Sequence, residues 1–246
     1  MNERHTETFM SEHDAWLERV RTNWNERAPR WDEMSEANAE APDRPADLER
    51  TAAALGLKPG SRLLDAGCGS GQFAIAFADF GCRVTAIDLA PDMIARGRKH
   101  AAERGVEVEW RVGEVARLSD SVAAYDAIHA RAMLQFVPDV PAALREFRRV
   151  LKPGGRLYAS VPGALSPIYN RSWRRFIEPH KVGTSYMVPW ELEEVLQALG
   201  WTILDGWGNT GRNLTGDENP LAPSALDGLD RRLQQAAATT WAVIAK

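Results

Sequence analysis

The chain has 246 residues, of which 44% are apolar and 26% are charged, and its formal net charge is −4 at pH 7. This composition excludes a largely disordered, collagen-like or disulfide-scaffold protein, and the length suits one large domain or two small ones. Because a negative chain is a poor electrostatic match for a polyphosphate backbone, a general nucleic-acid binder is disfavoured.

Neither the start of the chain nor its cysteines indicate export or metal binding. No run of 18 apolar residues is present, so we expect no membrane span. The polar start MNERHTETFM lacks the apolar core of a secretory signal, and we expect a cytoplasmic protein. Cys68 and Cys82 do not have the spacing of metal ligands. The strands predicted below place them at opposite edges of a parallel sheet, too far apart for a disulfide bond.

The first 45 residues are polar but carry Trp16, Trp24 and Trp31 at spacings of 8 and 7. This pattern predicts an amphipathic helix over residues 12–27 that covers another part of the molecule.

From residue 62, short runs of Val, Ile and Leu alternate with stretches of helical period. We predict strands at residues 62–66, 83–88, 107–112, 127–130 and 156–161 and helices at 71–80, 91–104 and 140–151. Such alternation predicts right-handed crossovers and a mostly parallel sheet covered on both faces. Ligands of such sheets bind beyond the carboxyl ends of the strands, where the strand order reverses.

The last third of the chain begins with a long connection, residues 162–189, which contains Tyr169, Trp173, Phe176 and Tyr186. Long aromatic connections are typical of lids. A helix at 189–199, a strand at 201–206, a helix at 224–235 and a strand at 240–245 follow, and the two strands can run antiparallel. We expect one domain of four parts: a helical cap (1–45), a cofactor-binding core (46–161), a lid (162–190) and the C-terminal part of the sheet (191–246).

A glycine-rich turn, LLDAGCGSG at residues 63–71, follows the first strand and opens a helix. Gly67, Gly69 and Gly71 let the backbone turn sharply and let a ligand approach the peptide groups. The chain has Gln72 where a dinucleotide-binding fingerprint needs a third glycine, and it lacks the Lys-Ser/Thr of a P-loop. Asp88, at the end of the next strand, can accept hydrogen bonds from both ribose hydroxyls. Together these features indicate a nucleoside ligand without phosphate.

Four segments in this order resemble the class I S-adenosylmethionine-dependent methyltransferases: LLDAGCGSG, AIDLAPDMI, YDAIHARAMLQFVPD and FRRVLKPGGRL. Within them the chain is most similar to the small-molecule group of ubiquinone/menaquinone-type and natural-product enzymes, over about residues 59–163. The resemblance implies an α/β, doubly wound, Rossmann-like fold with a mostly parallel seven-stranded sheet. It also implies S-adenosyl-L-methionine as cofactor and methyl transfer to a small-molecule acceptor at oxygen, nitrogen or carbon.

The resemblance also implies roles for single residues. Asp65 faces the methionine amino group, and the turn glycines form the cradle below the methionine part. Asp88 is the ribose acid. Trp31 covers the cofactor where relatives often have Tyr. The remaining cofactor positions are Leu89 on the adenine face, Glu114 and Val115 at the adenine amino edge, and Ala130 and Arg131 beside the methionine amine.

Candidates for catalysis are fewer. Gln135 stands where the family often has His or Gln near the methyl donor. His180, in the predicted lid, has a side chain whose pKa of about 6.5 suits a general base, and a surface histidine is the alternative reading. His129 lies mid-strand and is expected to be a hydrogen-bonded core residue. Arg171, Arg174 and Arg175 either attract an anionic group of the substrate or form a solvated face.

The expected chemistry is an in-line displacement in which orientation contributes about 7–11 kcal/mol. The alternatives are an RNA or protein methyltransferase of the same fold, a nicotinamide dehydrogenase, and a non-catalytic S-adenosylmethionine-binding protein. Oligomeric state, whether monomer or homodimer, does not follow from the sequence.

Overall fold

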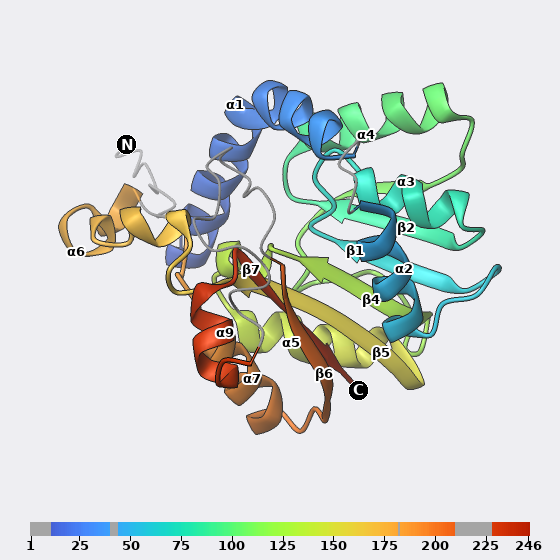
Figure 1. Ribbon diagram of the computed structural model, residues 1–246. Helices are drawn as coiled ribbons and strands as arrows, with labels where there is room; N and C mark the ends of the chain where they lie inside the picture. The colour runs from blue at the N-terminus through green and yellow to red at the C-terminus, as the bar shows by residue number, and fades with distance from the viewer. Residues whose placement is uncertain (1–10, 40–43, 182, 210–227) are drawn as a thin grey trace, which may run out of the picture.

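A computed structural model describes residues 11–39, 44–181, 183–209 and 228–246, and all structural statements below refer to these residues. Its centre is a seven-stranded sheet in the order β3-β2-β1-β4-β5-β7-β6 (Figure 1). The strands are β1 Arg62–Ala66, β2 Arg83–Asp88, β3 Glu109–Val112, β4 Tyr125–Arg131, β5 Leu151–Pro162, β6 Ile203–Asn209 and β7 Thr240–Ala245.

The first five strands of the sheet are parallel, and β7 runs antiparallel to both β5 and β6. This confirms the doubly wound, mostly parallel fold and the antiparallel pairing of the last two strands. The strand order reverses between β1 and β4, because the chain crosses from β3 at one edge to β4 beside β1. The carboxyl ends of these strands are therefore where a ligand site is expected.

Helices cover both faces of the sheet (Figure 1). The helices are α1 Glu12–Ala39, α2 Arg44–Leu55, α3 Gln72–Asp79, α4 Pro91–Arg104, α5 Val140–Val150, α6 Arg174–Ile177, α7 Pro189–Ala198 and α9 Arg231–Ala237, with short 3-10 helices η1 Leu134–Phe136, η2 Pro167–Arg171 and η3 Pro179–Lys181. Among them, none combines the length and apolar character needed to cross a bilayer.

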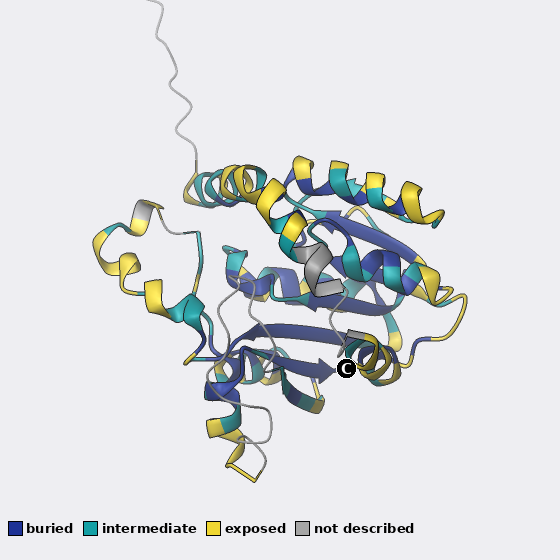
Figure 2. Cartoon of the chain, turned by 45° about the horizontal axis from the view of Figure 1, so that its top comes forward, coloured by how far each residue is buried: buried dark blue, intermediate teal, exposed yellow. Residues whose placement is uncertain are grey.

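The core is divided by the sheet into two apolar clusters. Leu63 on β1 packs with residues of α2 and α3, whereas its neighbour Leu64 packs with residues of α5 and α7. Successive side chains of a strand point to opposite faces, so adjacent apolar residues are needed where both faces are covered. In Figure 2 the inner strands of the sheet are largely buried, and many exposed positions lie on the outer sides of the helices.

Several predicted boundaries were wrong. The helix predicted at 12–27 extends to Ala39 and runs through Pro29, and β3 begins at Glu109 instead of residue 107. Strands β4 and β5 begin earlier than predicted, because Tyr125 already pairs with Leu151. The next pair is Ala127 with Arg156, so residues 152–155 form an irregularity within β5. The helix predicted at 224–235 is α9, which begins at Arg231; residues 224–227 lie outside the described residues.

Helix α2, the longest of the helices that were not predicted, packs on the sheet. Helix α2 places Leu48, Ala52 and Leu55 against the sheet at a spacing of one helical face. It ends before Gly56, whose φ of +69° suits a glycine at a helix end. The apolar spacing was therefore a usable signal.

Candidate functional site

The glycine turn between β1 and α3 has the left-handed backbone that glycine favours. The φ angles of Gly67, Gly69 and Gly71 are +68°, +54° and +84°, a region that costs other residues roughly 1–2 kcal/mol. The N–H groups of Gly67 and Cys68 both donate to the carbonyl of Ile87, at 2.8 and 3.1 Å. The turn is therefore fixed to the end of β2.

Asp88, the last residue of β2, accepts backbone hydrogen bonds with both carboxylate oxygens, one of them from the glycine turn. The N–H of Gly69 donates to one oxygen and the N–H of Ala90 to the other, each at 2.9 Å. Burial raises the pKa of the Asp88 carboxyl above its ordinary value, and the hydrogen bonds from Ala90 and Gly69 counteract part of that rise. Each oxygen has a second lone pair, so the carboxylate can still accept a ligand hydroxyl.

Asp65, in β1, forms a buried pair with His129 in β4. The Nδ1 atom of His129 lies 2.7 Å from Oδ1 of Asp65, and both side chains are almost completely buried. His129 is therefore a hydrogen-bonded core residue, as predicted. The other oxygen, Oδ2 of Asp65, is buried without a hydrogen-bond partner among the described residues. A buried carboxylate oxygen of this kind calls for a donor from a ligand.

Helix α1 covers the turn with aromatic side chains. A Cβ atom added to Gly69 would lie 3.2 Å from Nε1 of Trp31, so this indole lies directly on the turn. Trp24 makes edge contacts with both Trp31 and Phe136, with ring centroids 5.2 Å apart in each pair. The indole N–H of Trp16 donates to the carbonyl of Phe136 at 2.8 Å.

Polar contacts attach α1 to the core at both of its ends. Nε2 of His13 lies 2.8 Å from Oε1 of Glu114. Asp32 is buried and pairs with Arg96 at 2.9 Å and with His100 at 3.3 Å, both on α4. Moving α1 away from α4 would leave Asp32 as a buried carboxylate without its partners, which is energetically costly. These contacts therefore hold α1 in a defined position over the turn.

The absence of a side chain at Gly71 makes room for Trp110 of β3. A Cβ atom at Gly71 would lie 2.1 Å from Cη2 of Trp110, and one at Gly97 of α4 would lie 2.4 Å from Cζ3 of the same ring. The indole thus lies between the two glycines. Trp110 was not among the predicted site residues; a glycine inside a helical pattern, Gly97, was the available signal.

The predicted adenine-edge residues follow β2 and β3. Leu89 is partly buried beside Asp88, and Val115 is buried in the core. Glu114 is paired with His13, as described above, and its Oε2 atom lies 3.6 Å from Nε of Arg117.

At the end of β4, Ala130 is buried and Arg131 directs its guanidinium to α2. Arg131 donates to Asp47 at 2.7 Å and to the Tyr158 hydroxyl at 3.3 Å. Gln135 is buried and donates to the carbonyl of Ala132 at 2.8 Å, and its Oε1 atom has no partner among the described residues.

The described residues contain no group of three His, Cys, Asp or Glu side chains able to hold a metal ion. Both cysteines are free thiols, in agreement with the sequence analysis. His180 lies in η3, and its side chain is outside the described residues.

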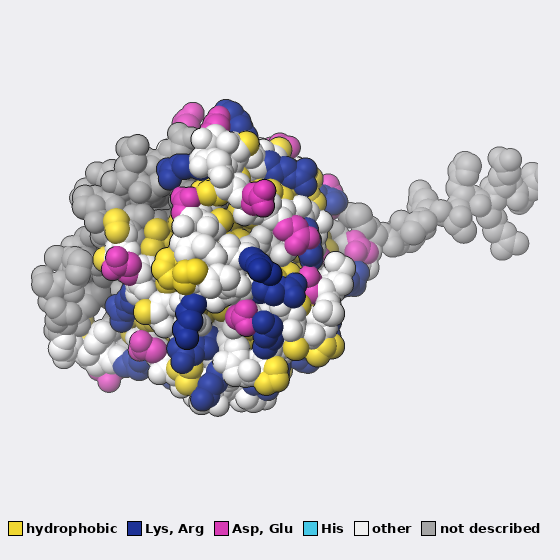
Figure 3. All heavy atoms as spheres, turned by 90° about the vertical axis from the view of Figure 1, so that its right-hand side faces the viewer, with side chains coloured by type: hydrophobic (Ala, Val, Ile, Leu, Met, Phe, Trp, Pro, Cys, Tyr) yellow, Lys and Arg dark blue, Asp and Glu magenta, His cyan; other side chains and the backbone are white. Residues whose placement is uncertain are grey.

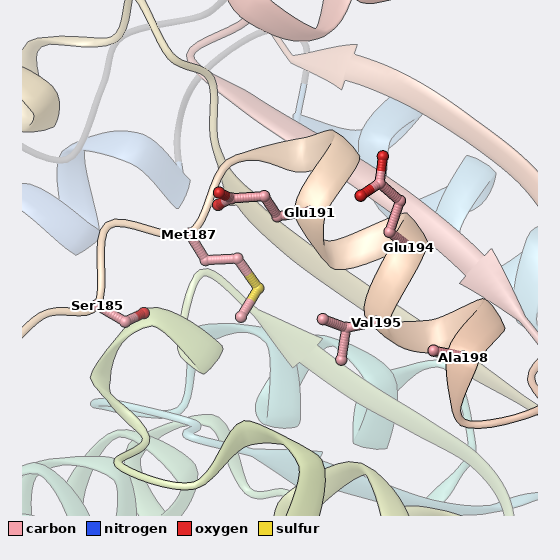
Figure 4. A pocket seen from close by; sticks show the side chains of 6 residues that line it. All are labelled: Ser185, Met187, Glu191, Glu194, Val195 and Ala198. Atoms are coloured by element: carbon pink, nitrogen blue, oxygen red, sulfur yellow. The ribbon is translucent and has the colours of Figure 1, made fainter.

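A separate groove of about 520 Å³ lies along α7, lined by Ser185, Met187, Glu191, Glu194, Val195 and Ala198 (Figure 4). Its two carboxylates already have partners. Glu191 accepts from the Val188 N–H at 2.9 Å, and Glu194 pairs with Arg232 at 3.3 Å. None of the predicted site residues lines this groove.

The comparisons with known proteins agree with the geometry. The family described as "Methyltransferase domain" matches residues 35–205. The chain belongs to this methyltransferase family. It is an S-adenosylmethionine-dependent methyltransferase, and the unpartnered Asp65 oxygen and the glycine turn fit a nucleoside that carries an amino-acid group.

Among its curated relatives is a ubiquinone biosynthesis O-methyltransferase of Xanthomonas campestris pv. campestris (strain B100). The two proteins are 35% identical over 186 residues, and the match covers 68% of the present chain and 76% of the relative. The protein of the same name from Xanthomonas oryzae pv. oryzae (strain PXO99A) is 42% identical over 118 residues, 48% of this chain and 49% of that one.

Solved structures share the methyltransferase fold. A SAM-dependent methyltransferase from Aquifex aeolicus matches with a TM-score of 0.60 and 17% identity, covering 89% of this chain and 97% of that one. The [4+2]-cyclase SpnF also matches with a TM-score of 0.60, at 26% identity, covering 80% of this chain and 78% of that one. The fold is therefore compatible with more than one reaction.

Proposed function

We propose that this methyltransferase transfers the methyl group of S-adenosylmethionine to an oxygen atom of a small-molecule acceptor. The observation that carries the proposal is the aromatic cover over the glycine turn, formed by Trp24 and Trp31 of α1 together with Phe136. Such a cover offers apolar, aromatic surface that suits a small, partly apolar acceptor. The two curated relatives from Xanthomonas are named ubiquinone biosynthesis O-methyltransferases, which supports oxygen as the acceptor atom.

The cofactor-binding roles belong to the same proposal. Asp88 binds the ribose hydroxyls while it continues to hold Gly69 and Ala90, and its partial burial supports this role. Oδ2 of Asp65 accepts from the methionine ammonium, since this oxygen otherwise stays unpaired. The backbone of Gly67 and Gly69 approaches the methionine part, and Gly71 supports the turn through its contact with Trp110.

The remaining roles concern the adenine and the methionine ends. Leu89 and Val115 provide apolar surface for the adenine. Glu114 accepts from the adenine amino group, for which His13 must yield its position near Oε1. The Ala130–Arg131 backbone lies beside the methionine amine, while the guanidinium of Arg131 remains with Asp47.

The catalytic contribution of the protein is mainly orientation and the exclusion of water. S-adenosylmethionine, when bound, supplies a methyl group activated by a sulfonium. Trp31 and Trp24 keep water from the reacting atoms, and a fixed alignment of the reactants contributes about 7–11 kcal/mol. Buried Gln135, with its free Oε1, orients the acceptor hydroxyl, and His180 is the proposed base.

Within a single domain, we assign residues 1–45 as the cap, 46–161 as the cofactor-binding core, 162–190 as the lid over the acceptor and 191–246 as the C-terminal part of the sheet. Tyr169 and Tyr186 support the lid assignment: their rings are in contact, with centroids 5.7 Å apart, and the Tyr186 hydroxyl donates to the Arg171 carbonyl at 3.3 Å.

The experiment combines binding with product analysis. Isothermal titration is expected to give binding of S-adenosylmethionine and S-adenosylhomocysteine but not of NAD. Incubation with methyl-labelled cofactor and a mixture of small phenols, small amines, RNA and protein is expected to label the phenol fraction. At a cofactor concentration that does not saturate the enzyme, Asp88→Asn should give less label, because it binds the cofactor more weakly. Label found in RNA or protein alone overturns the small-molecule proposal, and labelled amines without labelled phenols overturn the oxygen assignment.

A further inference from the structure

The segment from Leu165 to Lys181 exposes large apolar side chains beside basic ones. Trp173, Phe176 and Ile177 are 57%, 73% and 69% exposed, and Leu165 is 71% exposed. Large apolar side chains are usually mostly buried, so these exposed fractions are unusually high. The segment projects from the body of the protein at α6, where the cartoon is largely coloured as exposed (Figures 1 and 2).

The segment that carries these exposed side chains is itself ordered by hydrogen bonds. The Tyr169 hydroxyl donates to the Tyr186 carbonyl, and Tyr186 in turn bonds to the Arg171 carbonyl. Ser166 is buried at the base of the segment. These contacts fix the inner side and leave Trp173 and its apolar neighbours pointing outward.

The charge of the segment is opposite to that of the chain. Residues 165–181 contain four Lys and Arg residues and one Glu, a formal charge of +3, whereas the whole chain has −4. Arg174 lies over the Trp173 ring at 5.8 Å, and Arg175 lies over Phe176 at 4.5 Å. The acid, Glu178, pairs with Lys181 at 3.0 Å, which leaves the arginines as the net charge.

The face shown in Figure 3, which looks onto the other side of the molecule, carries basic and acidic side chains interspersed. By contrast, residues 165–181 combine a net positive charge with exposed aromatic side chains, and we call this segment the α6 patch. Interspersed charges are typical of a solvated surface, whereas a projecting basic and aromatic patch is typical of a segment that lies in a membrane interface.

We propose that the α6 patch docks the enzyme on an anionic lipid bilayer, with Trp173, Phe176 and Ile177 entering the headgroup region and Arg171, Arg174 and Arg175 contacting lipid phosphates. A convex, projecting patch suits a deformable surface better than it suits a groove of a protein. Trp favours the interface between headgroups and acyl chains, and arginine binds phosphate through its fixed fork of donors.

The test is sedimentation of the full-length protein with vesicles of phosphatidylcholine alone or mixed with phosphatidylglycerol, at low and high ionic strength. The protein is expected to sediment with the anionic vesicles at low salt and to be released at high salt, because salt screens the attraction. Arg171→Gln/Arg174→Gln/Arg175→Gln is expected to weaken binding by about fivefold per arginine, and Trp173→Ser/Phe176→Ser by about tenfold.

A matched control removes the same charge elsewhere, in Arg83→Gln/Arg104→Gln/Arg145→Gln, three exposed arginines of β2, α4 and α5. It is expected to bind vesicles like the unaltered protein. All variants should retain their affinity for S-adenosylhomocysteine, since none of the substituted residues belongs to the proposed cofactor site, and this readout confirms folding.

Three results would overturn the proposal. The first is failure of the unaltered protein to sediment with anionic vesicles. The second is an equal loss of binding in the control variant, which would mean that overall charge decides. The third is light scattering that shows a dimer converted to a monomer by Trp173→Ser/Phe176→Ser, which would make the α6 patch a contact between copies of the chain.

Discussion

Replacement of Gly97 by alanine tests the packing beneath the cofactor turn. Gly97 lies inside α4, where glycine costs about 1 kcal/mol relative to alanine in an unobstructed helix. The added Cβ would lie 2.4 Å from Cζ3 and 2.6 Å from Cη2 of Trp110. The indole cannot move freely the other way, because it already fills the position where Gly71 would carry a side chain.

The two effects have opposite signs, and their sizes decide the result. Overpacking of this kind typically costs about 1–3 kcal/mol, and the ring confined on both sides favours the upper half of that range. After subtraction of the helix-propensity gain, Gly97→Ala is expected to lower the free energy of unfolding by about 1–2 kcal/mol. Urea unfolding followed by circular dichroism measures this change. Pressure of the ring on Gly71 should also raise the dissociation constant of S-adenosylhomocysteine several-fold.

The matched control is the same substitution made in a Trp110→Val background. With the indole removed, Gly97→Ala should stabilise the protein by about 0.5–1 kcal/mol, as in an unobstructed helix. The sign of the effect therefore reverses between the two backgrounds. If Gly97→Ala has the same sign and size in both, the contact with Trp110 does not explain why α4 has a glycine there.

Three other outcomes are expected. Asp88→Asn should weaken S-adenosylhomocysteine binding about 10-fold or more. Burial raises the pKa of Asp88, so its carboxylate becomes protonated at a higher pH than an ordinary Asp does. The affinity of the unaltered protein should therefore decline at that higher pH, and a flat pH profile by calorimetry would contradict this. Trp31→Ala should weaken the same binding about 10-fold and Trp31→Phe much less, since the apolar cover is retained; equal losses would assign the effect to the indole N–H. Burial, and to a lesser extent Asp126, raises the pKa of Cys82 to about 11. Its reaction with Ellman's reagent at mildly alkaline pH should therefore be about 100-fold slower in native than in urea-unfolded protein. Similar rates in the two states would disprove the shift.

Local sequence patterns were sufficient for the core of the fold. The glycine turn, the acid at the end of β2 and the period of α5 are each encoded within a few residues. Strand β1, strand β2 and helix α4 accordingly have the predicted bounds. The buried pairing of His129 also followed from its mid-strand position.

The sequence was less informative where distant segments meet. Helix α2 was missed, and α1 continues past its predicted end to Ala39. The contact of Trp110 with both Gly71 and Gly97 joins three elements separated along the chain, and no local pattern relates them. The same is true of His13 beside Glu114 and of Asp32 beside His100.

The sequence by itself determined the alternation of strands and helices from β1 to β5, the turn at Gly67–Gly71 and the acid at Asp88, because backbone conformation and the period of apolar residues depend on neighbouring residues. Only the tertiary structure decided that Asp88 holds the turn through Gly69, that one oxygen of Asp65 stays unpaired, and that Trp31 closes the turn. These properties depend on which side chains come together when α1 packs across the ends of the strands, and packing between segments so far apart along the chain is fixed by shape and burial in three dimensions.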